Sequence, residues 1–230
     1  MLISLFNAAF RPGKGVLRRT WKRRGGGPQV VEYDLADGDQ RFYPQLLEPR
    51  RGTRIVMPRH GKSCKRGPGE LWLALWIKWH SIKGFYDNLA LRTGGHRYEP
   101  DLAYIDEQRG IFIDIENDEP YTMGRRMPTH IIGSDDQRNG LITAAGWIVL
   151  RFSERQCVAT PARVVRMVMD VVRSIDPSVE MPQALRDVQP AEPDERWNRD
   201  TAQGYAKSRY RDSYLERHLP LYRFFNQFYK

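Results

Sequence analysis

Apolar and polar positions form their clearest pattern between residues 99 and 118. Two short apolar runs, at 102–105 and 111–115, flank a polar turn that ends at Gly110, and this arrangement predicts a β-hairpin. Side chains alternate between the two faces of a strand, so the isoleucines of the second run share one face and are expected in the core. They are Ile111, Ile113 and Ile115.

Acidic residues occupy the opposite face of that second strand, at Asp114, Glu116 and Asp118. If the turn centres on the middle of the polar segment, Asp101 lies across from the strand between Asp114 and Glu116. Like charges on one face of a strand repel, so these crowded carboxylates need a compensating cation, and hard oxygen ligands suit Mg²⁺ or Mn²⁺. The alternative is the solvated outer face of an edge strand.

A helix is predicted at residues 70–80, directly after the Gly-Pro-Gly sequence of residues 67–69. Tryptophans and leucines line more than one side of it, and a helix this apolar is expected to be mostly buried. Glu70 lies in its first turn. There it either interacts with the helix dipole or contributes a further carboxylate to the hairpin site.

The second half of the chain predicts a helix, a buried strand and another helix in succession. The first helix ends at Gly146, and the apolar run 147–152 is typical of a buried parallel strand. The second helix begins at Thr160 and keeps helical spacing of its apolar residues as far as Ile175, so it should cover the sheet. These elements together predict an α/β fold.

Four regions are expected along the chain. Residues 1–66 form a basic region with a small β-hairpin, and residues 67–176 form the core. Residues 177–195 contain four prolines and predict a linker. Residues 196–230 form a helical appendage rich in aromatic and basic side chains, which either stack on nucleic-acid bases or dock on the core or on a partner.

The basic excess is concentrated at one end of the chain. Of a net charge of +9, residues 1–66 carry 15 Lys and Arg against 5 Asp and Glu. This favours a polyanionic partner, most simply nucleic acid, over a basic tail that only aids solubility. Residues 11–27 predict a glycine-rich arm without regular structure that contacts phosphates, and the hairpin strands are predicted at 30–35 and 41–43. The phosphate contacts expected from the arm are Arg18, Arg19, Lys22, Arg23 and Arg24.

Two further features bear on where the protein works. No run of 18 apolar residues occurs in the sequence, so no membrane-spanning helix is expected. The 230 residues include two cysteines, which provide no disulfide framework. A reducing cytoplasm fits this composition best.

The order of these elements resembles the PD-(D/E)XK nuclease superfamily over about residues 67–175. Pro100-Asp101 matches the PD element, Asp114-Ile115-Glu116 matches the (D/E)-x-K element, and Glu70 matches the acidic residue on the first core helix. Residues 138–156 are similar to the second half of the very-short-patch-repair and DUF559-like branch. Glu116 stands where the family has lysine, and some restriction enzymes of the superfamily carry Glu there and remain active.

The resemblance implies a restriction-endonuclease-like αβββαβ core, a mixed central sheet flanked by helices, and Mg²⁺- or Mn²⁺-dependent hydrolysis of phosphodiester bonds in DNA. It implies that Asp101 and Asp114 bind the metal, and that Glu70 and Glu116 complete the site, with Glu116 as ligand or base. Arg151 either contacts a phosphate or pairs with a core carboxylate. Such proteins often occur in bacterial defence and mobile-element settings. The phosphate contacts expected near the cut are Arg125, Arg126, His130 and Arg138.

Two other hypotheses compete with this one. The first is a nucleic-acid-binding protein with an inactive nuclease core, and the missing lysine supports it. The second is a structural subunit that recruits a helicase or ATPase through residues 196–230. The sequence leaves open whether the nucleic acid is DNA or RNA, although DNA is favoured.

Overall fold

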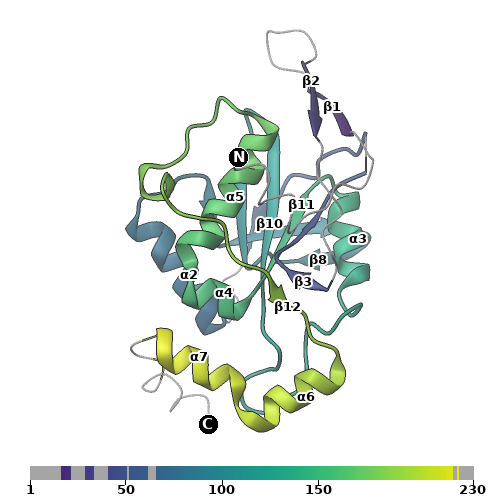
Figure 1. The fold of residues 1–230 in the computed structure, drawn as a ribbon. Coiled ribbons are helices and arrows are strands. Elements are labelled where there is room, and N and C mark those ends of the chain that lie inside the picture. Colours follow the sequence, from purple (N-terminus) through teal and green to yellow (C-terminus); the bar gives the residue numbers. More distant parts are fainter. Residues whose placement is uncertain are drawn as a thin grey trace.

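A computed structural model describes residues 41–50, 52–61, 66–219 and 222, and the backbone of two strands at 17–21 and 29–33. The fold is a mixed α/β arrangement in which helices flank a central sheet (Figure 1). The α/β fold class predicted from the sequence is therefore confirmed.

The central sheet has five strands in the order β4-β11-β10-β9-β6. β10 and β11 are parallel, and the other neighbours are antiparallel. The apolar run that predicted a buried parallel strand is β11, whose six residues are all buried. The strands are β4 (Gln45–Leu47), β6 (Phe85–Tyr86), β9 (Leu102–Asp106), β10 (Ile111–Asp118) and β11 (Ile148–Ser153).

The predicted hairpin is β9 and β10. Ala103 pairs with Asp114 and Leu102 with Ile115, so the next position of this register places Asp101 against Glu116, one residue beyond the position that the sequence pattern predicted. The three isoleucines of β10 are at most 2% exposed and belong to the main core. The turn therefore sets which acidic residues meet.

Helices cover both faces of the sheet. α2 (Pro68–Trp79) and α5 (Pro161–Ile175) pack on the isoleucine face of β10, and α3 (Asp136–Ala144) packs on the face that carries Phe112 and Trp147. The short helix α4 (Glu154–Ala159) links β11 to α5. The acidic face of β10 is thus not a solvated edge but an interior surface beneath α3.

The expectation that α2 is mostly buried is wrong. Leu73, Ala74 and Ile77 are buried, but Leu71 and Leu75 are about half exposed and Trp79 is 84% exposed. A helix on the outside of a layer buries only the side that faces the sheet, so α2 has more apolar residues than its contacts can cover. 

The strand pairing predicted for a small hairpin at residues 30–43 is also wrong. β2 (Gln29–Tyr33) pairs with β1 (Leu17–Trp21), while β3 (Phe42–Tyr43) pairs with β12 (Asp194–Glu195). Part of the basic arm expected to lack regular structure is therefore a strand. A local turn signal cannot reveal a partner strand that comes from the far end of the chain.

Residues 177–219 pack closely on the core. Residues 177–195, expected to be a linker, include the short helix η1 (Gln183–Leu185), and Leu185 is completely buried in the main core. α6 (Arg199–Ser208) and α7 (Tyr210–His218) follow, separated by Arg209 in the left-handed region. Their aromatics dock back on the core, one of the alternatives that the sequence left open.

A second, smaller sheet lies beside α3. It has the order β5-β7-β8, from β5 (Arg59–His60), β7 (Leu89–Thr93) and β8 (His96–Tyr98). The hydroxyl of Thr93 donates to the carbonyl of Leu141 on α3 at 3.4 Å, so the β7–β8 turn rests on that helix. Within the described residues, no helix has the length and apolar character needed to cross a membrane.

Candidate active site

The acidic residues predicted from the hairpin converge inside the protein. Asp114 is completely buried and Glu116 is 1% exposed. Asp101, just before β9, accepts a hydrogen bond from the backbone N–H of Asn117 at 2.8 Å through its Oδ2. Asp101 is therefore fastened to β10 beside Glu116, which is the juxtaposition that the alternation pattern predicted.

Asp114 is the least compensated of these groups. Neither of its carboxylate oxygens has a hydrogen-bond partner among the described residues. Burial, and then repulsion by Glu116, raise the pKa of Asp114 well above its ordinary value. Burial, Glu116 and Glu70 do the same to the pKa of Asp101. Unpaired buried polar groups are costly, so this pair of aspartates is where a cation would be stabilising.

Glu116 is held by Arg138 of α3. The guanidinium donates to both carboxylate oxygens, with Nη2 2.6 Å from Oε1. Nη2 also lies 3.4 Å from the carbonyl oxygen of Glu99. The side chain of Arg138 is 24% exposed, so it reaches from solvent to the buried carboxylate. The phosphate contact predicted for Arg138 stays a prediction, and its partner among the described residues is Glu116.

Glu70 caps a helix and lies near other carboxylates. Its Oε1 accepts the backbone N–H of Gly67 at 3.1 Å and so caps the start of α2. Burial raises the pKa of Glu70 to about 7, with smaller contributions from the carboxylates of Glu119 and Glu116. The same residue therefore stabilises a helix end and lies within electrostatic reach of the buried acids.

Arg151 pairs with a core carboxylate, which decides between the two roles considered for it. Its Nε and Nη2 donate to the two oxygens of Asp118 at 2.9 and 2.6 Å, and its Nη1 donates to Oδ1 of Asn139 at 2.8 Å. The arginine is completely buried. Asp118 also accepts a hydrogen bond from the hydroxyl of Tyr43 at 2.9 Å, so donors from more than one element stabilise its charge.

A second set of potential metal ligands surrounds that arginine. Asp118, His130 and Asp135 each offer an atom, and these atoms lie within 4.8 Å of one another. Nη2 of Arg151 lies 2.6 Å from Oδ1 of Asp118, 3.1 Å from Nδ1 of His130 and 3.3 Å from Oδ2 of Asp135. A guanidinium thus already supplies the positive charge here, and this cluster does not fit a metal ion.

His130 is an ion-pair partner within that cluster. Burial lowers its pKa, but the carboxylates of Asp118 and Asp135 outweigh burial and raise the pKa to about 9. Its Nδ1 lies 3.1 Å from Oδ2 of Asp135. The phosphate contact predicted for His130 is not what its described neighbours favour, because two carboxylates already bind it.

The donor set at Asp101, Asp114 and Glu116 does fit a hard divalent cation. All are carboxylates, which Mg²⁺ and Mn²⁺ favour, and Asp114 has both oxygens unpaired among the described residues. The carboxylate oxygens of these three residues do not all lie within 4.8 Å of one another, as the ligand atoms around Arg151 do. Glu116 is instead bound to Arg138, so Asp101 and Asp114 are the groups that are left to hold an ion.

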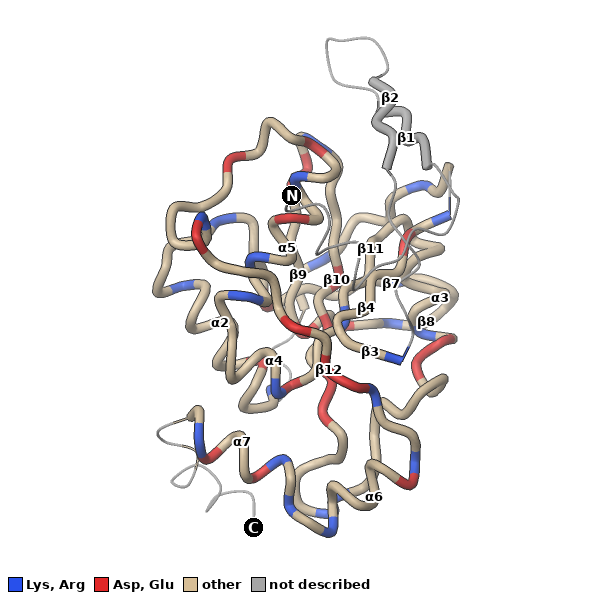
Figure 2. Tube along the Cα trace, viewed as in Figure 1, with Lys and Arg blue, Asp and Glu red and all other residues tan. Residues whose placement is uncertain are grey.

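A further buried ion pair lies near Glu70, and nothing in the local sequence pattern indicated it. Glu154 at the start of α4 accepts hydrogen bonds from Nε and Nη2 of Arg211 at 2.6 and 2.7 Å, and from the hydroxyl of Tyr214 at 2.8 Å. Acidic positions gather around β12 and the end of β10 in Figure 2. Among them, Glu154 is compensated by Arg211 of α7.

The other predicted phosphate contacts lie away from the carboxylates or outside the description. Arg125 and Arg126 are exposed on the loop between β10 and α3, and neither has an ion-pair partner among described residues. Arg18 and Arg19 lie in β1, of which only the backbone is described. Lys22, Arg23 and Arg24 lie outside the described residues.

No family model, no curated protein and no solved structure matches this chain.

Proposed function

We propose that this protein hydrolyses phosphodiester bonds in nucleic acid, with DNA favoured, and that the reaction depends on Mg²⁺ or Mn²⁺. The observation that carries the proposal is Asp114, whose two buried carboxylate oxygens have no hydrogen-bond partner among the described residues. It lies one strand from Asp101, which is partly exposed. An unpaired carboxylate is costly in an interior, and a divalent cation bound by Asp114 and Asp101 removes that cost.

The arrangement of the elements supports a restriction-endonuclease-like core. In chain order, α2, β6, β9, β10, α3 and β11 give the αβββαβ sequence that the resemblance implies. β6, β9 and β10 form an antiparallel series, and α3 crosses to the parallel strand β11. The β7–β8 hairpin is an insertion in this scheme. The acidic residues lie where the resemblance puts the metal site.

Asp101 and Asp114 would hold the ion, with Glu70 as a nearby carboxylate that raises the pKa of Asp101. When bound, Mg²⁺ or Mn²⁺ supplies Lewis-acid polarisation of a phosphoryl oxygen and a nucleophile at neutral pH. Glu70, with its pKa near 7, is suited to accept or return a proton in that range. Burial of these groups strengthens every electrostatic interaction with the substrate.

Arg138 takes the place of the missing lysine in this proposal. The family lysine supplies a positive charge beside the metal carboxylates, and here the residue at that position is Glu116. The guanidinium of Arg138 brings a positive charge to the same point through its ion pair with Glu116. Because the guanidinium is partly exposed, it can also contact a phosphate oxygen of the substrate.

The test is cleavage of supercoiled plasmid DNA, and of RNA in parallel, by the purified protein with Mg²⁺, with Mn²⁺ or with EDTA. Asp114→Asn keeps the shape of the side chain and should lower the rate on the order of 10²–10³-fold. Asp200→Asn, on the exposed side of α6, is the matched control and should retain full activity. Cleavage that survives Asp114→Asn, or that persists in EDTA, would falsify the proposal.

A second candidate is a nucleic-acid-binding or partner-recruiting subunit without catalysis. The ion pair between Glu116 and Arg138 favours it, because this pair engages a carboxylate that would otherwise be a ligand. Salt-dependent DNA binding with no cleavage in either metal would favour this candidate. Recruitment of a helicase or ATPase through residues 196–230 would show as co-purification that is lost when exposed residues of α6 are substituted.

A further inference from the structure

The small sheet β5-β7-β8 has an outer face lined with arginines. Arg92 and Arg97 are direct cross-strand partners, and Arg59 pairs with Ala90, two residues along β7 from Arg92. Residues that pair directly, or that are two apart on one strand, share a face. Arg59, Arg92 and Arg97 therefore project from the same side of the sheet, and all three are exposed.

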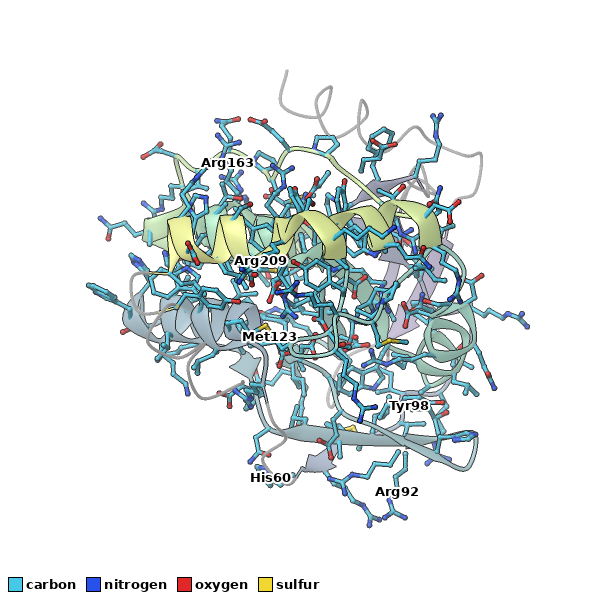
Figure 3. The ribbon with its side chains drawn as sticks, turned by 90° about the horizontal axis from the view of Figure 1, so that it is seen from below. His60, Arg92, Tyr98, Met123, Arg163 and Arg209 are labelled. Atoms are coloured by element: carbon cyan, nitrogen blue, oxygen red, sulfur yellow. The ribbon has the colours of Figure 1, made fainter. Side chains whose placement is uncertain are left out.

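The inner face of this sheet fixes that orientation. Leu89, Leu91 and Tyr98 pack in the hydrophobic cluster beneath α3. A strand cannot slip by one residue without moving these side chains into solvent. Figure 3 shows Arg92 at the edge of the molecule, pointing away from the core.

The positive charge on this face is largely uncompensated. The segments 52–61 and 89–98, which contain the three strands, carry four arginines and no acidic residue. Arg97 forms an ion pair with Glu99, but Arg59 and Arg92 have none with any acidic residue that the structure describes. Two arginines directly opposite one another repel, so an anion bound between Arg92 and Arg97 would relieve a cost built into the sheet.

The spacing of the arginines suits a row of phosphates. Direct partners have Cβ atoms about 5 Å apart and diagonal partners about 7–8 Å apart, so the row spans about 12 Å. One strand of a duplex carries a charge every 3.4 Å or so along its axis, and the row therefore covers about three phosphates. Contacts from arginines to phosphates position a nucleic acid without reading its sequence.

Along the chain, β8 leads directly to the candidate active site. β8 ends at Tyr98, and only Glu99 and Pro100 separate it from Asp101, a distance of about 10 Å at most. The carbonyl oxygen of Glu99 lies 3.4 Å from Nη2 of Arg138. A chain of phosphates laid on the sheet would reach Arg138 and then the carboxylates.

We propose that the outer face of the β5-β7-β8 sheet, through Arg59, Arg92 and Arg97, binds the sugar–phosphate backbone of the nucleic-acid substrate without reading its sequence. The proposal rests on the proposed function for the identity of the polyanion. It assigns substrate binding to a part of the chain far from the N-terminal basic arm.

The test measures binding of a fluorescent DNA duplex to the full chain in EDTA, so that cleavage does not interfere, at several salt concentrations. The variant is Arg59→Gln with Arg92→Gln. The matched control is Arg163→Gln with Arg173→Gln, a partly exposed and an exposed arginine of α5. Arg163 lies on the opposite side of the molecule from Arg92 (Figure 3), and its ion pair with Glu192 is exposed and contributes little to stability.

The variant on the sheet should bind on the order of 10–60-fold more weakly at about 0.1 M salt, and the slope of log affinity against log salt should fall by about two. The control should bind like the natural protein. Equal binding by both double variants overturns the proposal, as does a natural chain that binds no duplex. Binding to vesicles containing phosphatidylserine, without binding to DNA, overturns it in favour of a lipid surface.

Cleavage separates this proposal from the proposed function. If Asp114→Asn binds DNA normally and the Arg59 and Arg92 variant does not, the binding surface stands whether or not the natural protein cleaves. If the natural protein cleaves and the Arg59 and Arg92 variant binds and cleaves equally well, the binding surface is wrong and the nuclease function stands.

Discussion

The guanidinium of Arg151 and the carboxylate of Asp118 form a two-point ion pair in the interior, with N–O distances of 2.9 and 2.6 Å. The two side chains are at most 1% exposed. They join the ends of two parallel strands, and Tyr43 and Asn139 bond to them from a third strand and from α3. Both charges are stable in the interior because they are satisfied together.

Arg151→Met is therefore expected to lower the free energy of unfolding by about 3–5 kcal/mol, because it removes the two-point partner of the buried Asp118 charge. Urea denaturation measures the effect. Adding Asp118→Leu to Arg151→Met should recover part of the loss, since no uncompensated charge is then buried. A loss below about 1 kcal/mol in the single variant would mean that Arg151 is not buried against Asp118.

Arg211→Met should detach the C-terminal helices from the core. Arg211 is the buried partner of Glu154 and also donates to the carbonyl oxygen of Tyr121 at 2.9 Å. Hydrogen exchange in α6 and α7 should rise strongly, and stability should fall by about 3–5 kcal/mol. Arg217→Met makes the same change at an exposed position of α7 and should alter neither. Unchanged exchange in Arg211→Met would contradict the role of this ion pair.

Alanine substitutions at two helical glycines should act in opposite directions. A Cβ at Gly69 would lie 2.6 Å from Cγ of Glu154 and 2.9 Å from Oδ1 of Asn117, whereas a Cβ at Gly204 would have no neighbour within 4 Å. Gly204→Ala should stabilise the protein by about 0.5–1 kcal/mol through helix propensity. Gly69→Ala should destabilise it by about 1–3 kcal/mol through steric overlap. Thermal denaturation distinguishes the two, and equal effects would disprove the close approach of α2 to α4.

His130 should make stability depend on pH between about 6.5 and 9. Its pKa is raised to about 9 in the folded protein from about 6.5 in the unfolded chain. The stabilisation is therefore fully present below pH 6.5 and is lost as the pH rises through 9. His130→Gln should cost about 3 kcal/mol more at about pH 6 than at about pH 9.5.

The source of that pH dependence can be checked in an Asp135→Asn background. There His130→Gln should show a weaker dependence, because one of the two carboxylates that raise the histidine pKa has lost its charge. A difference between His130→Gln and the natural protein that is the same at both pH values would rule out the charged histidine.

Binding of Mg²⁺ or Mn²⁺ should stabilise the folded protein. At a concentration 100 times the dissociation constant, the gain is about 2.7 kcal/mol. Asp114→Asn should abolish this gain and, without metal, should be more stable than the natural protein above neutral pH, because it removes repulsion with Glu116. Asp200→Asn should keep the gain. A metal-induced gain that Asp114→Asn retains would place the ion elsewhere.

The sequence predicted the hairpin and its site because both depend on local periodicity. Alternation along residues 111–118 separates the isoleucines from the acids, and the turn brings Asp101 to Glu116. The same reasoning failed for β3, whose partner β12 lies at the other end of the chain. It also failed for α2, where the number of apolar residues does not reveal how many the neighbouring elements can cover.

What the sequence alone determined is which residues are acidic, which face of β10 they share, and that they lie close to Asp101. Only the tertiary structure decided how each charge is compensated. Arg138 forms an ion pair with Glu116, Arg151 with Asp118 and Arg211 with Glu154. Asp114 has no hydrogen-bond partner among the described residues. The physical reason is that a buried charge is stabilised by whichever group lies beside it in space, and each of these arginines comes from an element that no local pattern connects to its carboxylate.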